Sequence, residues 1–178
     1  MIALAVGGCP KVESTPGASP TAENPRADRT ESNRDEGPSA GEQGKLEGLT
    51  DAHNAVRKQV GVAPLRWSRA LARHAQSWAD RLAVNDCALK HRPSDKYGEN
   101  LFWSSQPATA SEVVAEWASE AAHYDRRTNR CKATCGHYTQ VVWATTKSLG
   151  CGAAPCGGGE VWVCNYDPPG NIVGRKPY

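Results

Sequence analysis

Several features that would place this 178-residue chain in a common class of proteins are missing from it. No stretch approaches the roughly 20 apolar residues of a membrane-spanning helix. No run of lysine and arginine is interleaved with aromatic residues, so nucleic acid is not indicated as a partner. The seven cysteines form no Cys-x-x-Cys pair of the kind that structural zinc sites use. The length suits one domain with additional segments.

Two catalytic motifs are missing as well. The chain has no Gly-x-Ser-x-Gly turn that would present a serine nucleophile, and no His-Glu-x-x-His helix of a zinc protease. The sequence therefore gives no independent support for a serine hydrolase or a metalloprotease.

Large apolar side chains are almost absent between Pro10 and Lys45, where Val12 is the only one. Serine, proline, glycine, glutamate and arginine dominate this stretch. Such a composition cannot bury enough surface to offset the entropy lost on ordering. We therefore expect residues 10–46 to form a disordered tether.

The first nine residues end in Val-Gly-Gly-Cys after a short apolar run. This pattern resembles the end of a bacterial lipoprotein signal, in which small residues precede a cysteine that is lipidated after cleavage. We interpret residues 1–9 as the remainder of a signal and predict a lipid at Cys9, which would be the only attachment to a membrane. The alternative is a chance apolar N-terminus with a free thiol.

Six cysteines lie between Cys87 and Cys164, and none lies in the predicted tether. This density favours three disulfides and an oxidising compartment, outside the cell or at the surface of its envelope. A reduced protein with scattered thiols is the alternative. If all six are oxidised, the domain keeps no thiolate nucleophile.

Apolar residues at helical spacing predict three helices. The first is capped by Thr50 or Asp51, and the second begins after Ser68. In the third, Thr109 and Glu112 form a capping box ahead of an apolar stripe.

Glu120 falls inside the stripe of the third helix, three residues after Trp117. A carboxylate on a buried face must be paired, hydrogen-bonded or protonated. Periodicity therefore marks Glu120 as a functional acid. The alternative is a structural salt bridge to Arg126, Arg127 or Arg130.

Two helical histidines are interpreted as structural. His53 lies on the first helix, where a lone histidine is more often hydrogen-bonded than a ligand. His74 lies one position off the apolar stripe of the second helix, which predicts a surface or margin residue.

The remaining apolar stretches predict strands. Tyr97–Trp103 is a short strand with Glu99 at its entrance, and Leu149–Pro155 and Glu160–Asp167 form a hairpin around a glycine-rich turn. The residues after Gly136 fit a short helix as well as a strand.

Six motifs, found in one order, give the chain a resemblance to a known family. They are HNAVR at 53–57, PLRW at 64–67, GENL at 98–101, WASE at 117–120, GHYTQVVW at 136–143 and VCNYDPPGN at 163–171. The domain at 47–178 resembles the CAP superfamily of cysteine-rich secretory proteins, antigen 5 proteins and pathogenesis-related 1 proteins, also called the SCP domain. It is most similar to the compact plant pathogenesis-related 1 type, and the segment that ends at Cys9 indicates a bacterial lipoprotein version.

The resemblance implies an α+β fold, a three-layer α-β-α sandwich with a central antiparallel sheet. It implies three disulfides, which are Cys87–Cys156, Cys131–Cys135 and Cys151–Cys164. It also implies a cleft lined by two histidines and two glutamates, which are His91, Glu99, Glu120 and His137.

Two neutral imidazoles beside oxygen ligands suit zinc or another divalent cation, with a position left for water. His91 and His137 are the candidate metal ligands. Glu99 and Glu120 are the candidate cleft acids and bases: they could accept the imidazole N–H groups, hold a water, or act as general base on a metal-bound one.

Three functions remain open on the sequence alone. The first is a binding or effector module for a lipid, a sterol or a protein. The cleft lacks a recognisable nucleophile–base pair, so we do not expect a conventional enzyme. We also expect the protein to be a monomer. The second is a metal-dependent hydrolase acting on peptides or cell-envelope material. The third is a structural surface domain whose four cleft residues brace the fold.

Overall fold

The computed structural model describes residues 41–93 and 96–178. The predicted signal segment 1–9, its lipidation site Cys9 and residues 10–40 of the predicted tether lie outside the described residues. Within the described ranges, no helix is long and apolar enough to cross a membrane.

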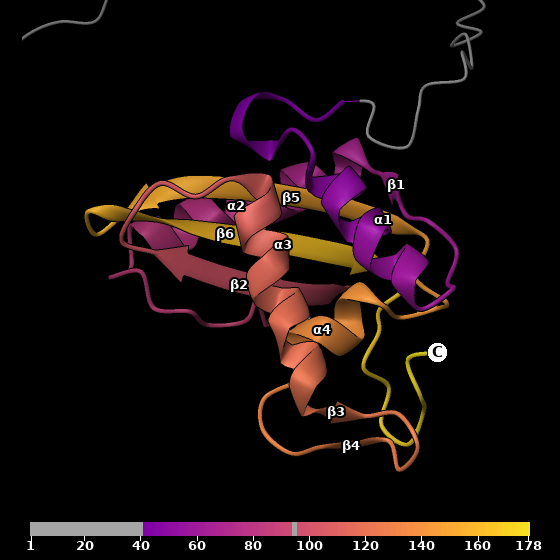
Figure 1. Ribbon diagram of the computed structural model, residues 1–178. Helices are drawn as coiled ribbons and strands as arrows, with labels where there is room; N and C mark the ends of the chain where they lie inside the picture. Colours follow the sequence, from indigo (N-terminus) through magenta and orange to yellow (C-terminus); the bar gives the residue numbers. More distant parts are fainter. Residues whose placement is uncertain (1–40, 94–95) are drawn as a thin grey trace, which may run out of the picture. The chain divides into compact units, whose positions relative to one another are not determined.

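A four-stranded sheet forms the middle of the domain (Figure 1). Its strands are β1 (Arg66–Trp67), β2 (Gly98–Ser104), β5 (Ser148–Cys156) and β6 (Gly159–Asp167), in the spatial order β1-β5-β6-β2. The three predicted strands are confirmed. The expected antiparallel sheet is corrected to a mixed one, because β1 enters alongside the start of β5 and pairs with it in parallel.

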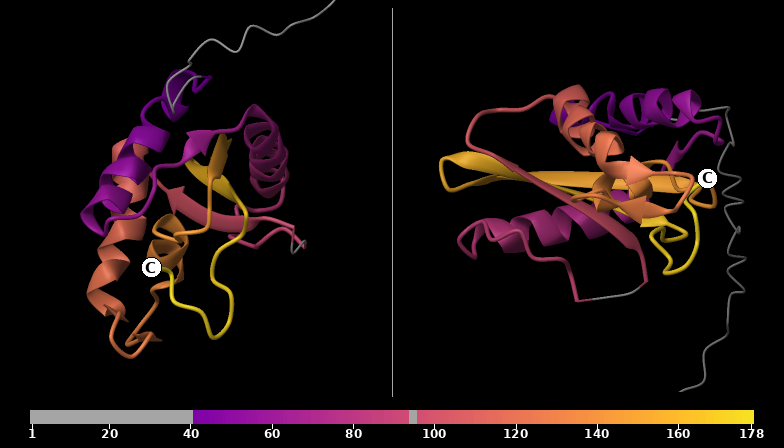
Figure 2. Two further views of the ribbon diagram at one scale, coloured as in Figure 1. Left: turned by 90° about the vertical axis from the view of Figure 1, so that its right-hand side faces the viewer. Right: turned by 60° about the horizontal axis from the view of Figure 1, so that its bottom comes forward.

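Helices cover both faces of the sheet, which confirms the α-β-α sandwich (Figure 2). One face carries α2 (Arg69–Ala83), and the other carries α1 (Leu49–Gln59), α3 (Ala110–Ser119) and α4 (Gly136–Val141). The stretch after Gly136 is thus helical. The shorter elements are η1 (Gly44–Leu46), η2 (Glu120–His123), and a small hairpin of β3 (Tyr124–Asp125) and β4 (Arg130–Cys131).

Strand β6 is buried on both faces, since helices cover the sheet twice. Trp162, Cys164 and Tyr166 pack among α1, α3 and α4, while Val161 and Val163 pack against α2. All of these residues are fully buried. Successive residues of a strand therefore serve opposite layers of the domain, as the two-residue period of a strand requires.

Two glycines allow α2 to lie close to β5. A Cβ at Gly150 would come within 2.2 Å of Ala72 N, and one at Gly152 within 2.4 Å of Gln76 Cα. Any larger residue would push the helix away from the sheet. The Gln76 side chain also bonds both backbone groups of Ala153, at 2.9 and 3.1 Å, which fixes the helix against the strand.

The starts of α2 and α3 follow the sequence prediction. Ser68 Oγ accepts a hydrogen bond from Leu71 N at 3.3 Å. Thr109 and Glu112 form the complete capping box, with each side chain bonded to the other residue's backbone.

The start of α1 differs from the prediction. The cap is Gly48, with φ 87°, and neither Thr50 nor Asp51. The Glu42 carboxylate accepts hydrogen bonds from Gly48 N at 2.8 Å and Thr50 N at 2.7 Å, so it satisfies donors that a capping side chain would serve. Glu42 belongs to the predicted tether, and the folded domain therefore extends at least to Glu42. Lys45 pairs with Glu160 and fastens the same segment to β6.

A buried arginine ties α1 to the end of α4. The Arg57 guanidinium donates to the carbonyl oxygens of Ala63, Val141, Trp143 and Thr146, at 2.8–3.2 Å. Burial lowers the pKa of Arg57 to about 10, which leaves the side chain charged at neutral pH. Hydrogen bonds from a charged donor are stronger than neutral ones, so this cluster fixes the turn that follows α4.

The three expected disulfides are confirmed. Cys87–Cys156 joins the loop after α2 to the end of β5, and Cys151–Cys164 crosses from β5 to β6. Cys131–Cys135 joins the β3–β4 hairpin to the residue before α4.

His53 is structural, as the sequence predicted. It is fully buried, its Nδ1 donates to Leu49 O at 2.7 Å, and its Nε2 accepts from the Tyr166 hydroxyl at 2.9 Å. The ring is therefore neutral, and burial lowers its pKa from 6.5 to about 4.

This burial predicts a loss of stability in mild acid. The unfolded chain binds a proton at His53 below pH 6.5, whereas the folded protein does so only below about pH 4. The contribution of His53 to the free energy of unfolding is thus complete above pH 6.5 and declines as the pH falls from 6.5 to about 4. Between pH 7 and pH 5 we expect His53 to account for a loss of about 2 kcal/mol, measured by urea unfolding.

The control is His53→Gln, which keeps a polar side chain and removes the titration. The difference in unfolding free energy between the wild-type protein and this variant should narrow from pH 7 to pH 5. A difference that stays constant over that range would contradict the assignment.

Candidate functional site

The first predicted pair is His91 with Glu99. Glu99 Oε1 accepts hydrogen bonds from His91 Nδ1 at 2.9 Å and from Arg92 N at 3.0 Å. Glu99 Oε2 accepts one from Asn165 Nδ2 at 3.3 Å. The glutamate side chain is 8% exposed and the histidine 64%. Their hydrogen bond raises the pKa of His91 because the carboxylate stabilises the imidazolium.

The second predicted pair is His137 with Glu120. Glu120 Oε1 accepts from His137 Nδ1 at 2.7 Å, and Oε2 accepts from the backbone N–H groups of His137 at 2.9 Å and Tyr138 at 3.2 Å. Helix α3 ends at Ser119, so Glu120 begins η2 and is not part of the α3 stripe. Its partner is this histidine. No ion pair joins it to the three arginines in the described part of the chain.

The two pairs follow one pattern. In each, a carboxylate oxygen faces Nδ1 of the histidine. A carboxylate accepts and cannot donate, so Nδ1 carries the proton and Nε2 of the neutral ring keeps its lone pair. Metal-binding histidines show this arrangement, in which the carboxylate orients the ring and makes it more basic.

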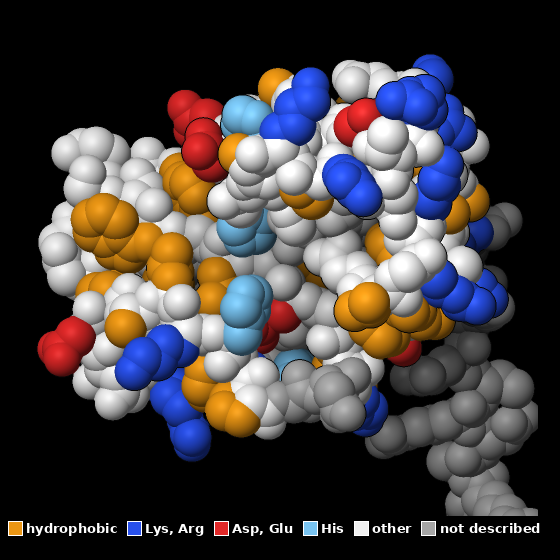
Figure 3. Space-filling view, turned by 90° about the horizontal axis from the view of Figure 1, so that it is seen from below, with side chains coloured by type: hydrophobic (Ala, Val, Ile, Leu, Met, Phe, Trp, Pro, Cys, Tyr) orange, Lys and Arg blue, Asp and Glu red, His pale blue; other side chains and the backbone are white. Residues whose placement is uncertain are grey.

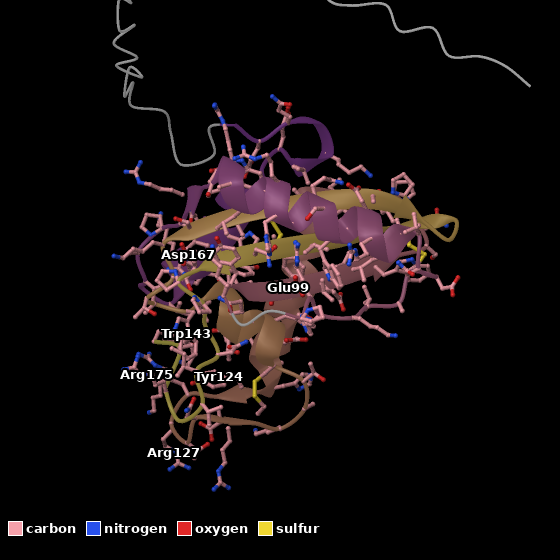
Figure 4. The ribbon with its side chains drawn as sticks, turned by 180° about the vertical axis from the view of Figure 1, so that it is seen from behind. Glu99, Tyr124, Arg127, Trp143, Asp167 and Arg175 are labelled. Carbon is pink, nitrogen blue, oxygen red and sulfur yellow. A yellow bond between two sulfur atoms is a disulfide. The ribbon has the colours of Figure 1, made fainter. Side chains whose placement is uncertain are left out.

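Strand β2 lies between the two pairs. Glu99 is paired in register with Asn165 and lies on the same side as Leu101 and Val163, toward α2. The next residue, Asn100, lies on the opposite side, where its Nδ2 donates to His137 O at 3.1 Å. The pairs therefore approach β2, the last strand of the sheet, from its two faces. Figure 4 shows Glu99 beside this strand.

Each pair lines a pocket of its own. His91 and Glu99 line one of about 150 Å³, together with His74, Arg92, Tyr97 and Asn165. Glu120 and His137 line one of about 240 Å³, whose other walls are Leu89, Leu101, Phe102, Trp103, Glu116 and Trp117. The loop after α2 borders both, since Leu89 lines the larger pocket and His91 the smaller. Figure 3, which shows the molecule from below, has pale-blue histidine side chains along a hollow of its surface.

Two residues of the smaller pocket were missed by the sequence reasoning. His74 contacts the Tyr97 ring edge-on at 5.0 Å, and burial lowers its pKa. Asn165 is 2% exposed, and its Oδ1 has no hydrogen-bond partner among the described residues. Such an acceptor suits a donor group of a ligand or a water. Only the register of β2 against β6 sets Asn165 beside Glu99, and the sequence does not display that register.

The donor chemistry fits a divalent cation in part. Nε2 of His91 and Nε2 of His137 are nitrogen ligands of the kind that zinc accepts, with carboxylates behind them. Among the described residues, however, no group of three or more histidine, cysteine, aspartate or glutamate side chains is arranged to hold a metal ion. The protein thus offers at most two imidazoles to one ion, and water or a bound ligand would complete its coordination.

Comparisons with known proteins agree with the fold. The model of the cysteine-rich secretory protein family, CAP, matches residues 50–166. Pathogenesis-related protein 1C of Nicotiana tabacum is 46% identical over 132 residues, which cover 72% of this chain and 77% of that protein. Venom allergen-like protein 4 of Schistosoma mansoni superposes with a TM-score of 0.64 at 28% identity, covering 76% of this chain and 94% of that one.

A crystal structure of NaASP2 with Zn²⁺ superposes with a TM-score of 0.62 at 23% identity, over 79% of this chain and 88% of that one, and supports the fold. The family model spans more than half of the chain, and the tobacco protein is similar over nearly three quarters of it. The chain therefore belongs to the CAP family of cysteine-rich secretory proteins and is similar within it to the plant pathogenesis-related 1 proteins.

Proposed function

We propose that this protein is an extracellular binding module whose two histidine–glutamate pairs recognise a divalent cation, such as zinc, at the edge of β2. One observation carries the proposal: both histidines turn Nδ1 to a carboxylate and keep Nε2 for a ligand. The loop that contains Leu89 and His91 supports a shared site, because it borders both pockets. NaASP2, which has the same fold, has been crystallised with Zn²⁺.

Binding fits the geometry better than hydrolysis does. A general base needs a free lone pair within reach of a water. Both oxygens of Glu99 and both of Glu120 already accept hydrogen bonds from the protein. The six cysteines of the domain are oxidised, which removes the thiolate nucleophile. A metal-dependent hydrolase would have to use the remaining lone pair of Glu99 Oε2 or of Glu120 Oε1, each of which has one partner.

The larger pocket indicates the class of organic ligand. Leu89 is 49% exposed and Trp103 39%, and together with Phe102 they form an apolar wall. His137 and Glu120 lie in the same pocket. A lipid or a sterol matches this combination, with its apolar body against the wall and its polar head at the histidine–glutamate pair.

The disulfides and the first residues support an extracellular location with a lipid anchor. Three disulfides are stable in an oxidising compartment, outside the cell or at its envelope. The Val-Gly-Gly-Cys run supports a lipid anchor at Cys9.

Zinc titration of the full chain by calorimetry tests the cation site. His91→Ala combined with His137→Ala should abolish binding, because both Nε2 ligands are lost. Glu99→Gln and Glu120→Gln should each weaken it about 10- to 100-fold, since the rings lose their orienting carboxylates. Affinity should also fall as the pH drops through the raised pKa of His91, because an imidazolium cannot bind a metal.

The matched control is His123→Ala, which removes an exposed histidine of η2 and should leave zinc affinity unchanged. Unaltered zinc affinity in the double variant would contradict the proposal. If the four cleft residues only stabilise the fold, the glutamate variants should lower the midpoint of thermal unfolding while zinc affinity stays the same.

The anchor is tested by detergent partition of the protein from its own cells. The wild-type protein should enter the detergent phase, and its mass should exceed that of the polypeptide from residue 9 by the added acyl groups. Cys9→Ser should move to the aqueous phase. Wild-type protein found only in the aqueous phase, with a free Cys9 thiol, would contradict lipidation.

A further inference from the structure

A second surface, apart from the histidine–glutamate pairs, carries a concentration of positive charge. Residues 124–132, which form the β3–β4 hairpin, and the C-terminal segment 171–178 contain one acidic side chain, Asp125. Against it stand six cationic side chains, which are Arg126, Arg127, Arg130, Lys132, Arg175 and Lys176. All six are exposed.

The hairpin and the C-terminal segment form one surface. Asn129 Nδ2 donates to Arg175 O at 3.0 Å, and Lys176 Nζ donates to Arg127 O at 3.4 Å. The Arg126 guanidinium lies 4.6 Å from the centre of the Tyr178 ring. Figure 4 shows Arg127 and Arg175 at the same end of the domain, near Tyr124 and Trp143.

The charge of this surface is not neutralised within the described part of the chain. None of the six cations forms an ion pair with a described carboxylate. The carboxylate of Asp125 accepts hydrogen bonds from the backbone N–H groups of Arg127 and Thr128. These charges therefore lack an anionic partner among the described residues and are available to an external one, while Lys176 Nζ also donates to Arg127 O and the Arg126 guanidinium lies against the Tyr178 ring.

Two hollows give the surface a shape that suits a chain-like ligand. One of about 350 Å³ runs between the hairpin and the C-terminal segment, with Tyr124, Trp143 and Arg175 among its walls. The other, of about 420 Å³, is lined by Trp143, Arg175 and Lys176. Trp143 and Arg175 border both hollows, so the two share a boundary where an aromatic ring and a cation lie together.

We infer that this surface binds an acidic polysaccharide, a polymer of uronic acid residues. Arginine matches a carboxylate with two parallel hydrogen bonds, and several cations at the rims match a repeated negative charge. The apolar faces of sugar rings pack on aromatic and aliphatic side chains, which the half-buried Tyr124 and the exposed Ile172 and Val173 supply at the first hollow. An anionic membrane would also meet the charge, but a flat lipid surface would leave both hollows unfilled.

The test is calorimetric titration of the full chain with unesterified polygalacturonate in 50 mM and 300 mM sodium chloride. Wild-type protein should bind. The higher salt should weaken binding, because binding releases counterions from the polymer and this release is less favourable in concentrated salt. Arg127→Ala, Arg175→Ala and Lys176→Ala combined should weaken binding about tenfold or more at low salt and reduce its salt dependence. Fully methyl-esterified polymer should not bind, because it lacks the carboxylates.

The matched control removes the same charge elsewhere. Lys58→Ala, Arg66→Ala and Arg73→Ala combined change exposed cations of α1, β1 and α2, and should leave binding unchanged. The variant of His91 and His137 should also bind normally, which separates this inference from the cation site.

Three results would overturn the inference: no binding of polygalacturonate by the wild-type protein at 50 mM salt, equal weakening by the two triple variants, or equal binding of the esterified polymer. Binding of vesicles that contain phosphatidylglycerol, without binding of polygalacturonate, would assign the surface to membranes instead.

Discussion

The two-residue period of strand β2 is the constraint on which the site depends. Glu99 and Asn100 are neighbours in the chain, so their side chains emerge on opposite faces of the sheet. Glu99 holds His91 on the face of α2, and Asn100 contacts the backbone of His137 on the face of α3 and α4. A site that includes both histidines must form around the edge of the sheet, and β2 supplies that edge.

The rest of the fold maintains this edge. The buried strand β6 pairs with β2 along its whole length, and the Cys151–Cys164 disulfide joins β6 to β5. Cys87–Cys156 anchors the loop that leads to His91, and Trp78 Nε1 donates to Lys90 O at 2.9 Å in the same loop. On the other face, the Arg57 guanidinium fixes the residues that follow α4. The histidines thus come from two short segments, each attached to the core near its functional residue.

Much of this could be predicted from local sequence. Apolar periodicity and capping residues gave α2 and α3, since Ser68, Thr109 and Glu112 act on donors within three residues. The start of α1 could not be predicted in this way. Its donors are served by Glu42, a single carboxylate in a stretch whose composition indicates a tether. The composition of a segment is an average over many residues and cannot reveal a single contact such as that of Glu42 with α1.

The family motifs proposed the four residues of the candidate site and did not indicate how these residues are arranged. Family motifs pointed to His91, Glu99, Glu120 and His137, and the structure joins them as two pairs that line two pockets. Glu120 bonds a histidine 17 residues away, and the nearby arginines do not replace that partner. Asn165 and His74 escaped notice because their role depends on strand register and on the packing of α2, neither of which appears as a local pattern.

The central claim is that both histidines keep Nδ1 protonated against a carboxylate and leave Nε2 for a ligand. Long-range ¹H–¹⁵N correlation spectra of the full chain at pH 8 test it most directly. The account predicts a protonated Nδ1 and an unprotonated Nε2 at His91 and at His137, with zinc shifting the Nε2 signal of each ring more than its Nδ1 signal. A protonated Nε2 at either residue before zinc is added, or a zinc-induced shift that is larger at Nδ1 than at Nε2, would contradict it.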